Sequence, residues 1–521
     1  MQANSLDVNS DRPRLATEVP GLLLAGLVFG YVAVRAARLA MTYDESTTYF
    51  CSLALVRDIL AYVSPCATAN NHLLYTLLVK ASATAFGSSE LALRLPSVLA
   101  FAVYLGAVLH LTRGTPVAVR LSSIIVLVAH PFMLDFFSLA RGYSLALALQ
   151  MVSLAALRVW TERDHSTFSS SLAFVSAALA TLANFAFLNF YVGLFVGVGA
   201  SLLFISLGTS TPPQLLRLCR ITTLVAMLGA LLPLALVVPP LLQLRASQEL
   251  FFGGTISFWT DSILSLCRTL LYGVVAPRWF PGWMVAAAIL VLVSFLFTSL
   301  AHLVVAETGA GAVSRSQFPV LVLVILSVTA LVNILQHHLL GSRYLAERTA
   351  LIYLPPFLLV LTLHLAAWAR SRSALVHAGA LALLIGLAAL CSVHTARTAQ
   401  LDSVHTWQYE ADSRRLVTAL EKIHAGAATA EQARQLVLRV TRSDAQSISF
   451  YRHVRQLDWL TLRSGLGGPD EFDFLYAGPY EEEILRRRDL RPVHTFRSTR
   501  SVLLVRVSSP WAGQIDRAAS E

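Results

Sequence analysis

Charged side chains are scarce in this chain of 521 residues. They account for 13% of the sequence, whereas 56% of the residues are hydrophobic. Soluble globular proteins carry about 25% charged residues. A fully soluble fold is therefore excluded, and the composition is that of an integral membrane protein.

Lysine is nearly absent: Lys80 and Lys422 are the two lysines, and every other basic residue is arginine. No basic patch with interleaved aromatic residues occurs, so nucleic-acid binding is not predicted. The formal net charge is +10, and residues 1–395 hold 22 basic against 14 acidic residues. An excess of arginine in the apolar part of a chain is typical of the cytoplasmic loops of a membrane protein.

Cysteine is scarce as well, and no CxxC pair occurs among Cys51, Cys66, Cys219, Cys267 and Cys391. Cys51 and Cys66 share one loop and are able to pair in an oxidising compartment, but separate, partly buried thiols are the expected state. The chain lacks HExxH, P-loop, Rossmann and GxSxG motifs in a useful context. No cofactor and no metal site is predicted, and a metal requirement stays open.

A cleavable signal peptide and internal repeats are also missing. The first apolar run is too long and too closely flanked by arginine for a signal peptide. We interpret it as a retained first span that follows a cytoplasmic tail, residues 1–18. Neither a solenoid repeat nor the inverted repeat of many transporters is found.

What the chain does contain is long apolar runs. A spanning helix needs about 20 largely apolar residues. Runs of this kind lie near 19–40, 95–112, 117–134, 139–160, 169–188, 190–208, 220–243, 282–305, 317–340, 349–368 and 374–394. Segments 72–87 and 262–276 are apolar but shorter. We therefore predict an all-α polytopic membrane domain of about 11–13 helices over residues 19–395.

The arginines between the apolar runs predict the orientation of this domain. The cytoplasmic side is marked by Arg12, Arg14, Arg35, Arg38, Arg113, Arg120, Arg158, Arg163, Arg217, Arg220, Arg315, Arg370 and Arg372. The external loops are then 41–71, 135–141, 244–281 and 341–348, together with everything after 395. A full crossing by 72–87 would place Arg113 and Arg120 outside, so this segment is expected to be short and tilted or re-entrant.

The tail, residues 396–521, has the charge density of a soluble domain, with 16 acidic and 18 basic residues. The stretches SRRLVTALEKIHA, TAEQARQL and PYEEEILRRR have helical periodicity, and LVLRVT, FDFLYAG and SVLLVRV are typical of strands. A small α/β domain on the extracytoplasmic side is predicted.

Ionisable residues at the edge of a membrane domain are the first candidates for chemistry. Asp44 and Glu45 stand in MTYDESTTYF, directly after the first span. A carboxylate can accept a proton from an attacking hydroxyl, and a guanidinium can bind a phosphate in a bidentate manner. The external carboxylates and arginines together predict a site for an anionic substrate.

Each candidate also has a structural alternative. The alternatives are ion pairs of Asp44 or Glu45 with Arg35 or Arg38, a pair between Asp135 and Arg141, interfacial positions for His337 and His338, and helix-end anchoring by Arg343 and Arg348.

The order of motifs along the chain adds a resemblance to a known family. After the acidic pair come NNHLLYTLLVKASATAFGSSELALRLPSVLA and SLARGYSLALAL, and RYLAERTALIYLPP follows much later. This series resembles the GT-C glycosyltransferase superfamily, most closely the bacterial branch of protein O-mannosyltransferase-like and aminoarabinose-transferase-like enzymes. FGSSELALRLPS is the strongest match. The resemblance covers residues 20–160 well and continues more weakly to about 395.

The resemblance implies an enzyme of the bacterial inner membrane and cell envelope. Such enzymes transfer a sugar from a polyprenyl-phosphate carrier to a lipid, glycan or protein hydroxyl on the external face, usually with inversion. Asp44 then matches the catalytic base, and its neighbour Glu45 belongs to the same predicted catalytic pair. Arg141 matches the arginine that contacts the donor phosphate, and Arg343 and Arg348 are further candidates for this contact. The implied partners are the donor, the acceptor and membrane lipids.

The chain also departs from the family pattern. Where many relatives have His-Pro-Pro-Leu-Tyr-Tyr, this chain has NNHLLY, and His72 and Asn71 are retained as candidate site residues on that basis. The Arg and Glu that often precede the ARxY unit are Ser138 and Leu139 here, so Asp135 is the candidate for a second acid. The alternative function is a transporter or flippase of a lipid-linked anion, and a third is a scaffold without catalysis whose tail is the active part.

Overall fold

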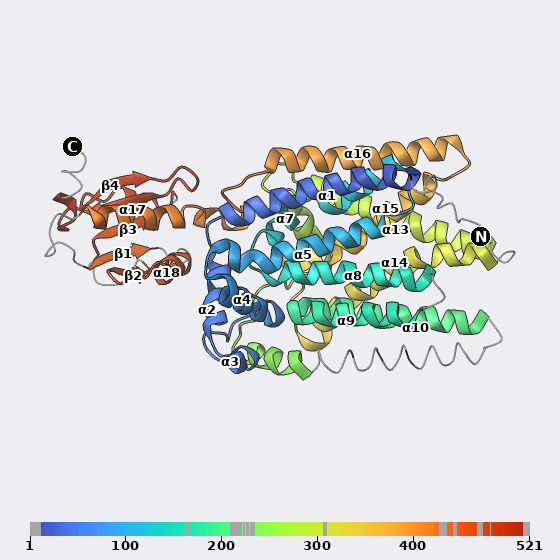
Figure 1. Ribbon diagram of the computed structural model, residues 1–521, viewed down its shortest axis with the longest axis horizontal. Helices are drawn as coiled ribbons and strands as arrows, with labels where there is room; N and C mark the ends of the chain where they lie inside the picture. The colour runs from blue at the N-terminus through green and yellow to red at the C-terminus, as the bar shows by residue number, and fades with distance from the viewer. Residues whose placement is uncertain are drawn as a thin grey trace, which may run out of the picture.

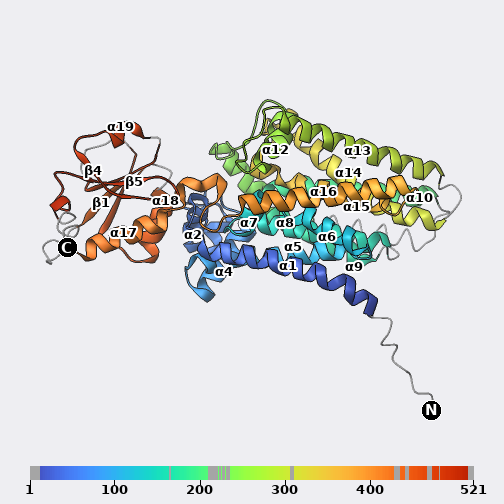
Figure 2. The same cartoon turned by 90° about the horizontal axis from the view of Figure 1, so that it is seen from above.

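The computed structural model describes residues 12–162, 166–208, 235–305, 310–426, 435–440, 445–465, 472–479 and 481–513, with the single residues Ile221, Val225 and Gly229. An elongated helical bundle adjoins a smaller α/β domain at one of its ends (Figure 1). Most helices of the bundle run along one common axis, as the two views show (Figures 1 and 2).

The N-terminal half of the bundle is built from ten α-helices and one 3-10 helix. They are α1 (Arg12–Arg38), α2 (Tyr43–Leu53), α3 (Val56–Leu60), α4 (Leu73–Phe86), α5 (Glu90–Leu111), α6 (Val117–Val128), α7 (Pro131–Phe137), α8 (Gly142–Glu162), α9 (Thr167–Ala183), η1 (Phe185–Phe187) and α10 (Leu188–Gly208). Helix α8 packs against α5 and α9, which gives the bundle its centre.

The C-terminal half of the bundle adds further long helices and several short ones. They are the helix Ala235–Ala246, the π-helix η2 (Phe258–Leu264), α12 (Ser265–Leu270), α13 (Phe280–Val305), α14 (Ala310–Leu340), the 3-10 helix η4 (Glu347–Tyr353), α15 (Leu354–Trp368) and α16 (Ala374–Thr398). Helix α14 packs against α10 and α15, so the second half closes onto the first.

This is a multi-pass membrane protein by the length and composition of its helices. Among the described residues, eight helices are long and apolar enough to span a membrane, and the bent pair α6–α7 raises the number to nine. Helix α9 has 17 residues and is also apolar. Half of the predicted span 220–243 lies outside the described residues, and its last part belongs to the helix Ala235–Ala246. The prediction of an all-α polytopic domain is confirmed, whereas 72–87 and 262–276 form short elements, α4 and η2–α12.

The two ends of the bundle differ in what they carry. Arg113 and Arg120 both pair with Glu18 near the start of α1, so they lie at the N-terminal end as predicted. Helices α2 and α4 lie at the opposite end, beside the α/β domain (Figure 1). The prediction that Arg35 and Arg38 lie on the same side as Arg113 and Arg120 was wrong, because the last turn of α1 carries both to this opposite end.

The segment between α2 and α4 is closed by a disulfide. Cys51 and Cys66 are bonded to each other, with their Cα atoms 4.8 Å apart. The expectation of separate thiols was wrong, because both side chains are buried side by side in one small apolar cluster with Tyr62 and Leu73. The bond ties the end of α2 to the loop that leads into α4.

The α/β domain contains one five-stranded sheet. Its strands are β1 (Leu436–Val440), β2 (Leu460–Ser464), β3 (Phe474–Ala477), β4 (Leu490–Thr495) and β5 (Val502–Arg506), in the order β2-β1-β3-β5-β4. Strand β1 pairs in parallel with β2 and β3, and β5 pairs antiparallel with β3 and β4. The helical elements are η5 (His405–Glu410), α17 (Ser413–Ala425), α18 (Ala445–Val454) and α19 (Glu482–Leu485).

This domain is packed firmly onto the bundle. One hydrophobic cluster continues from its sheet and helices into α2, α4 and α5, and the ring of Tyr49 meets that of Phe450 at 4.9 Å. Glu90 at the start of α5 pairs with Arg414 at 2.9 Å and accepts a hydrogen bond from the Tyr451 hydroxyl at 3.0 Å. The domain therefore helps to fix the position of α2.

Candidate active site

The first turn of α2 holds the acidic pair. Thr42 is the N-cap: its Oγ1 accepts the backbone N–H of Glu45, and the Glu45 carboxylate accepts the N–H of Thr42, which completes a capping box. Carboxylates in a first turn are favoured by the helix dipole. Asp44 and Glu45 follow each other on this turn, and both are buried, with 6% and 0% of their surfaces exposed.

Asp44 lies between two arginines that come from distant parts of the chain. Its Oδ2 is 3.2 Å from Arg141 Nη2 and 3.4 Å from Arg348 Nη1. Its Oδ1 accepts a hydrogen bond of 3.0 Å from the Asn70 amide, and the Asn70 oxygen accepts two bonds of 3.1 Å from Arg141. Three of these four residues were expected from the sequence to be in one site, and the structure brings those three together.

Aromatic rings support the two guanidinium groups. The guanidinium carbon of Arg348 lies 4.2 Å from the ring centre of Phe252 and 5.6 Å from that of Trp407, and that of Arg141 lies 5.9 Å from Tyr143. Such cation–π contacts hold a cation in place without cancelling its charge. The cluster of two arginines and one carboxylate keeps one net positive charge, which suits an anionic ligand.

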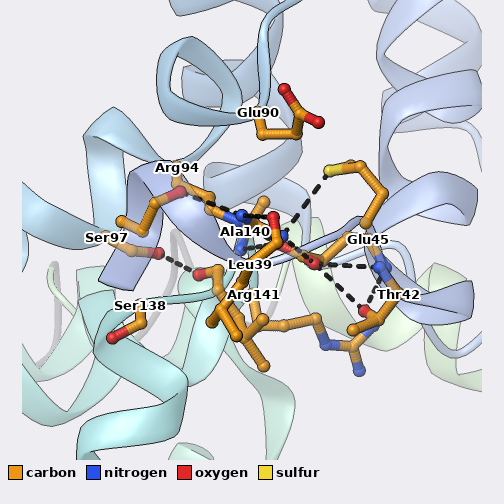
Figure 3. Close-up of polar contacts among 12 residues, drawn as sticks. Leu39, Thr42, Glu45, Glu90, Arg94, Ser97, Ser138, Ala140 and Arg141 are labelled. Carbon is orange, nitrogen blue, oxygen red and sulfur yellow. Dashed lines mark hydrogen bonds and ion pairs between the residues drawn. The ribbon is translucent and has the colours of Figure 1, made fainter. Parts of the chain in front are cut away.

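Glu45 makes a separate ion pair with Arg94 of α5 (Figure 3). Arg94 Nε and Nη2 donate to the two carboxylate oxygens, both at 2.7 Å, and the backbone N–H of Ala140 donates to Oε1 at 2.6 Å. Arg94 also donates to the carbonyls of Ala36, Leu39 and Ala40 at the end of α1. Every N–H of this fully buried guanidinium therefore has a partner.

The Glu45–Arg94 pair fixes the geometry around Asp44. It joins the end of α1, the start of α2, α5 and the segment that carries Arg141, as Figure 3 shows. Gly142 allows the segment that carries Arg141 to lie close to His72, since a Cβ on Gly142 would be 2.6 Å from the Cβ of His72. The segment that was recognised as the strongest family match, FGSSELALRLPS, thus supplies a positioning residue rather than a group that faces Asp44.

Asp135 belongs to another buried network at the same end. It pairs with Arg35 of α1 and accepts a hydrogen bond of 2.9 Å from the Tyr272 hydroxyl. Arg35 also donates to the carbonyls of Gln400 and Ser403, which lie just before the α/β domain. The alternative of a pair between Asp135 and Arg141 was therefore wrong: α7 ends between them, and the two side chains have different partners.

His72 and Asn71 lie next to the cluster but differ in what they contact. The His72 ring is 5.4 Å from that of Tyr143, and its Nε2 is buried without a hydrogen-bond partner. Burial and the nearby charges of Arg141 and Arg348 hold the pKa of His72 well below its usual range, so the ring is neutral. Asn71 instead donates to the Ile59 carbonyl and belongs to the loop.

Arg343 and the histidine pair lie away from Asp44. Arg343 is exposed and donates to the Gly253 carbonyl at 3.4 Å. The ring of His337 stacks on Tyr344 at 4.0 Å, and its Nδ1 lies 2.8 Å from the Ser342 carbonyl. Of the two late arginines named from the sequence, Arg348 is the one that reaches the cluster.

Some site residues were missed in the sequence. Arg94 stands alone as a basic residue in an apolar run, a signal that favours a buried partner. The pattern Thr42-x-x-Glu45 is a capping box and indicated a structural role for Glu45. Asn70 and Trp407 carried no such signal, because the first is one of two adjacent asparagines and the second lies beyond the last span.

No protein-family model matches this chain, and no curated protein matches it. It is similar to the solved structure of ArnT from Cupriavidus metallidurans bound to undecaprenyl phosphate, with 12% identity and a TM-score of 0.49 over 95% of this chain and 99% of that one. It is also similar to the archaeal oligosaccharyltransferase AglB from Archaeoglobus fulgidus, with 12% identity and a TM-score of 0.42 over 88% and 69% of the two chains. The arabinosyltransferase EmbB from Mycobacterium smegmatis follows, with 13% identity and a TM-score of 0.36 over 91% and 45%.

At these identities, and with TM-scores under 0.5, the similarities carry none of the functional argument. The function proposed next depends on the site itself.

Proposed function

We propose that this protein is a glycosyltransferase that moves a sugar from a polyprenyl-phosphate-linked donor to a hydroxyl of a lipid, glycan or protein acceptor. One observation carries the proposal. A buried carboxylate, Asp44, lies within 3.4 Å of two buried or half-buried arginines, Arg141 and Arg348, in a cluster of net positive charge. A base and an anion-binding pair are thus held side by side.

The reaction follows from these two elements. Asp44 accepts the proton of the acceptor hydroxyl, and the oxygen of that hydroxyl forms a bond to the anomeric carbon of the sugar. The bond from that carbon to the phosphate oxygen breaks, and the electron pair leaves with the polyprenyl phosphate. Arg141 and Arg348 stabilise the charge that develops on this leaving group. Asn70 is hydrogen-bonded to both Asp44 and Arg141 and keeps the two side chains in position.

A single displacement, which inverts the anomeric centre, suits this arrangement. A double displacement needs a second carboxylate as nucleophile. Glu45 has both oxygens occupied by Arg94, Ala140 and Thr42, and Asp135 is bound by Arg35 and Tyr272. Asp44 is the carboxylate that we assign to the reaction.

We place this site on the external, periplasmic side of a bacterial inner membrane. It lies at the end of the bundle opposite the N-terminus (Figure 1). The same end carries the Cys51–Cys66 disulfide, and disulfides persist in oxidising compartments rather than in the cytosol. Donors of this class expose their phosphate and sugar at the membrane surface, and Arg348, whose side chain is 19% exposed, lies at this end of the bundle.

The experiment compares the lipids that co-purify with the wild-type protein and with Asp44→Asn. The amide keeps the shape of the side chain and the bond to Asn70 but cannot accept the proton. We expect mass spectrometry to detect a polyprenyl-phosphosugar that is enriched in the variant, because the donor still binds and is not consumed. The mass would also give the elemental composition of the sugar.

The matched control is Arg141→Gln, which removes an anion contact and leaves the base. It should lose the bound donor, while Asp44→Asn retains it. Ordinary phospholipid alone in both Asp44→Asn and the wild type would overturn the proposal. Retention of donor without any transfer by the wild type would instead favour the transport of a lipid-linked anion.

A further inference from the structure

The backbone directly before Asp44 is held by side chains of the α/β domain. Residues 39–43 connect α1 to α2, and residues 39–42 have no regular secondary structure. Helices α18 and α2 pack against each other where the domain joins the bundle (Figure 2). Buried backbone groups outside helices and strands need hydrogen-bond partners from elsewhere in the protein. In this segment, several of those partners come from the α/β domain.

Two backbone N–H groups of the segment donate to the domain. The N–H of Tyr43 donates to Glu410 Oε2 at 2.7 Å, and the N–H of Met41 donates to the Tyr451 hydroxyl at 2.9 Å. The two acceptors lie 367 and 410 positions later in the sequence than their donors. The backbone one residue and three residues before Asp44 is therefore fixed by the other domain.

Carbonyl groups of the same segment accept hydrogen bonds from helix α17. Arg414 Nη2 donates to the Leu39 carbonyl at 2.7 Å, and the Ser413 hydroxyl donates to the Met41 carbonyl at 3.5 Å. These bonds hold the beginning of the segment, whereas Glu410 holds its end. The α/β domain thus contacts the segment along its whole length.

Glu410 bonds the N-terminus of α2. The first N–H groups of an α-helix have no partner within the helix, and the helix dipole favours a carboxylate beside them. Glu410 is 1% exposed, so this hydrogen bond is shielded from water. Tyr43 is the first residue of α2 and Asp44 is the second. Glu410 therefore fixes the turn of helix on which the proposed base lies.

The short helix η5 also reaches the anion-binding side of the site. Glu410 is its last residue, and Trp407 lies three positions earlier. The Trp407 ring is 5.6 Å from the guanidinium of Arg348, which in turn is 3.4 Å from Asp44. Thr42, Trp407 and Glu410 all line one cavity of about 10 Å³, which is about the space of a single water molecule. One element of the α/β domain thus packs against the start of α2 and against the second arginine.

We propose that Glu410 is a positioning residue of the transfer reaction, and that the α/β domain forms part of the active site through η5. Glu410 acts through the backbone of Tyr43: it holds the first turn of α2, so that Asp44 stays between the two arginines. A misplacement of about 1 Å can lower the rate of a reaction about a hundredfold. The kinetic part of this inference rests on the function proposed above, whereas the fixation of α2 by Glu410 does not.

The test compares Glu410→Ala with Glu410→Gln in the full-length protein. Alanine removes the hydrogen bond to the Tyr43 N–H, whereas the amide oxygen of glutamine still accepts it. Glu410→Ala should lower kcat about ten- to hundredfold, with the KM for the donor changed less than about twofold, because the arginines are unchanged. Glu410→Gln should restore most of kcat. The measurement is the steady-state kinetics of transfer from the donor that Asp44→Asn retains.

The matched control is Arg415→Gln. The Arg415 side chain is 52% exposed and pairs with Asp412 within the α/β domain, so it lies in the same helix as Ser413 and Arg414 without bonding the segment before Asp44. This variant should keep the kcat of the wild type. A loss in Glu410→Ala no greater than in Arg415→Gln would overturn the positioning role. Equal losses in Glu410→Ala and Glu410→Gln would overturn it as well, because the hydrogen bond would then not be the cause.

Hydrogen exchange provides a readout that does not need transfer. Amide exchange in peptides that cover residues 41–50 should be faster in Glu410→Ala than in the wild type, and close to the wild type in Glu410→Gln. Tyr451→Phe, which removes the acceptor of the Met41 N–H but keeps the ring, should accelerate exchange in the same peptides and serves if Glu410→Ala does not fold.

The two readouts separate this inference from the proposed function. Wild-type exchange in both Glu410→Ala and Tyr451→Phe would overturn the fixation of α2 by the domain. A wild-type protein that shows no transfer would overturn the proposed function and the kinetic part of the inference. Faster exchange in the two variants would still support the fixation of α2 in that case.

Discussion

Asp44 and Glu45 are neighbours in the sequence, yet the fold gives them different surroundings. Glu45 faces Arg94, and its two oxygens accept five hydrogen bonds from Arg94, Ala140 and Thr42. Asp44 faces Arg141 and Arg348, and its Oδ2 accepts no regular hydrogen bond. We therefore infer that Glu45 is a positioning residue, which corrects the predicted catalytic pair of Asp44 and Glu45.

Glu45→Gln should destabilise the protein strongly. Removing one partner of a fully buried ion pair leaves the other charge uncompensated, at a cost of about 3–5 kcal/mol. The measurement is the free energy of unfolding of the purified protein in mixed micelles. Glu90→Gln is the matched control, because the Glu90–Arg414 pair is partly exposed and should contribute at most about 1 kcal/mol.

One result would contradict the positioning role of Glu45. If Glu45→Gln unfolds like the wild type and nevertheless abolishes transfer, the carboxylate takes part in the chemistry. Adding Arg94→Gln to Glu45→Gln should restore part of the lost stability, since the second change removes the unpaired charge.

Asn70→Ala should reduce transfer while the fold stays intact. The amide connects Asp44 and Arg141, and hydrogen bonds to charged groups contribute about 1.5–3 kcal/mol, or roughly ten- to hundredfold in kcat/KM. Steady-state kinetics with the identified donor test this. The neighbouring Asn71→Ala is the control, because Asn71 donates to Ile59 within the loop. A larger loss of activity in Asn71→Ala would contradict this assignment.

At the level of elements, protonation of His72 at the start of α4 should make the free energy of unfolding depend on pH. His72 is the N-cap of α4, and its pKa in the folded protein is below that of an unfolded histidine, about 6.5. Protonation therefore favours the unfolded state. The contribution is fully present above about pH 6.5 and is lost as the pH falls, by about 1.4 kcal/mol per pH unit.

The measurement is the unfolding temperature between pH 5 and 8 for the wild type and His72→Gln. The variant should lose less stability toward acid than the wild type does. Parallel curves for the two proteins would show that other histidines cause the pH dependence.

The free energy of unfolding should depend on the disulfide in the loop between α2 and α4. Cys51 and Cys66 are 15 residues apart, and a bond that closes such a loop stabilises the folded state by about 3 kcal/mol. Cys51→Ala/Cys66→Ala should lower the free energy of unfolding by about that amount. Cys267→Ala, which removes an unbonded cysteine, should change it little. Two alkylatable thiols at these positions in the native, unreduced protein would contradict the bond.

Local patterns predicted some of the regular elements of the α/β domain, but β2, β4 and α18 were not predicted. The stretch predicted as a helix over 413–425 is α17, and strands β1, β3 and β5 lie within the predicted stretches. Strand β4 was missed because Pro492 argues against a strand, and β4 is indeed an edge strand with an irregularity between Pro492 and His494. Most of the predicted helix TAEQARQL lies outside the described residues.

The sequence predicted the charged residues of the site but not the residues that tertiary contacts bring to it. Asp44, Arg141 and Arg348 are charged residues at the ends of apolar runs, which a sequence shows directly. Asn70 contacts Asp44 and Arg141, which are 26 and 71 positions away in the sequence. Trp407 lies beyond the last span and contacts Arg348. No periodicity records such contacts, so they depend on the packing of the whole bundle.

For the whole molecule, the residues at the two ends of the bundle predict which end faces the cytoplasm. The N-terminal end carries Arg113 and Arg120 with Glu18, an arrangement typical of a cytoplasmic face. The arginine count alone is ambiguous, because the other end holds Arg35 and Arg38 as well. The Cys51–Cys66 bond favours the orientation proposed above, in which the end that carries Asp44 faces an oxidising compartment.

Single-cysteine variants in a background without other free thiols can test this orientation in intact cells. Ser464→Cys lies on an exposed residue at the end of β2, and Ser373→Cys lies on an exposed residue just before α16, at the opposite end of the bundle. A membrane-impermeant maleimide should label Ser464→Cys at once and Ser373→Cys after the cells are permeabilised. The reverse pattern would place Asp44 on the cytoplasmic side, where the disulfide would not persist and a carrier exposed outside would not reach the arginines.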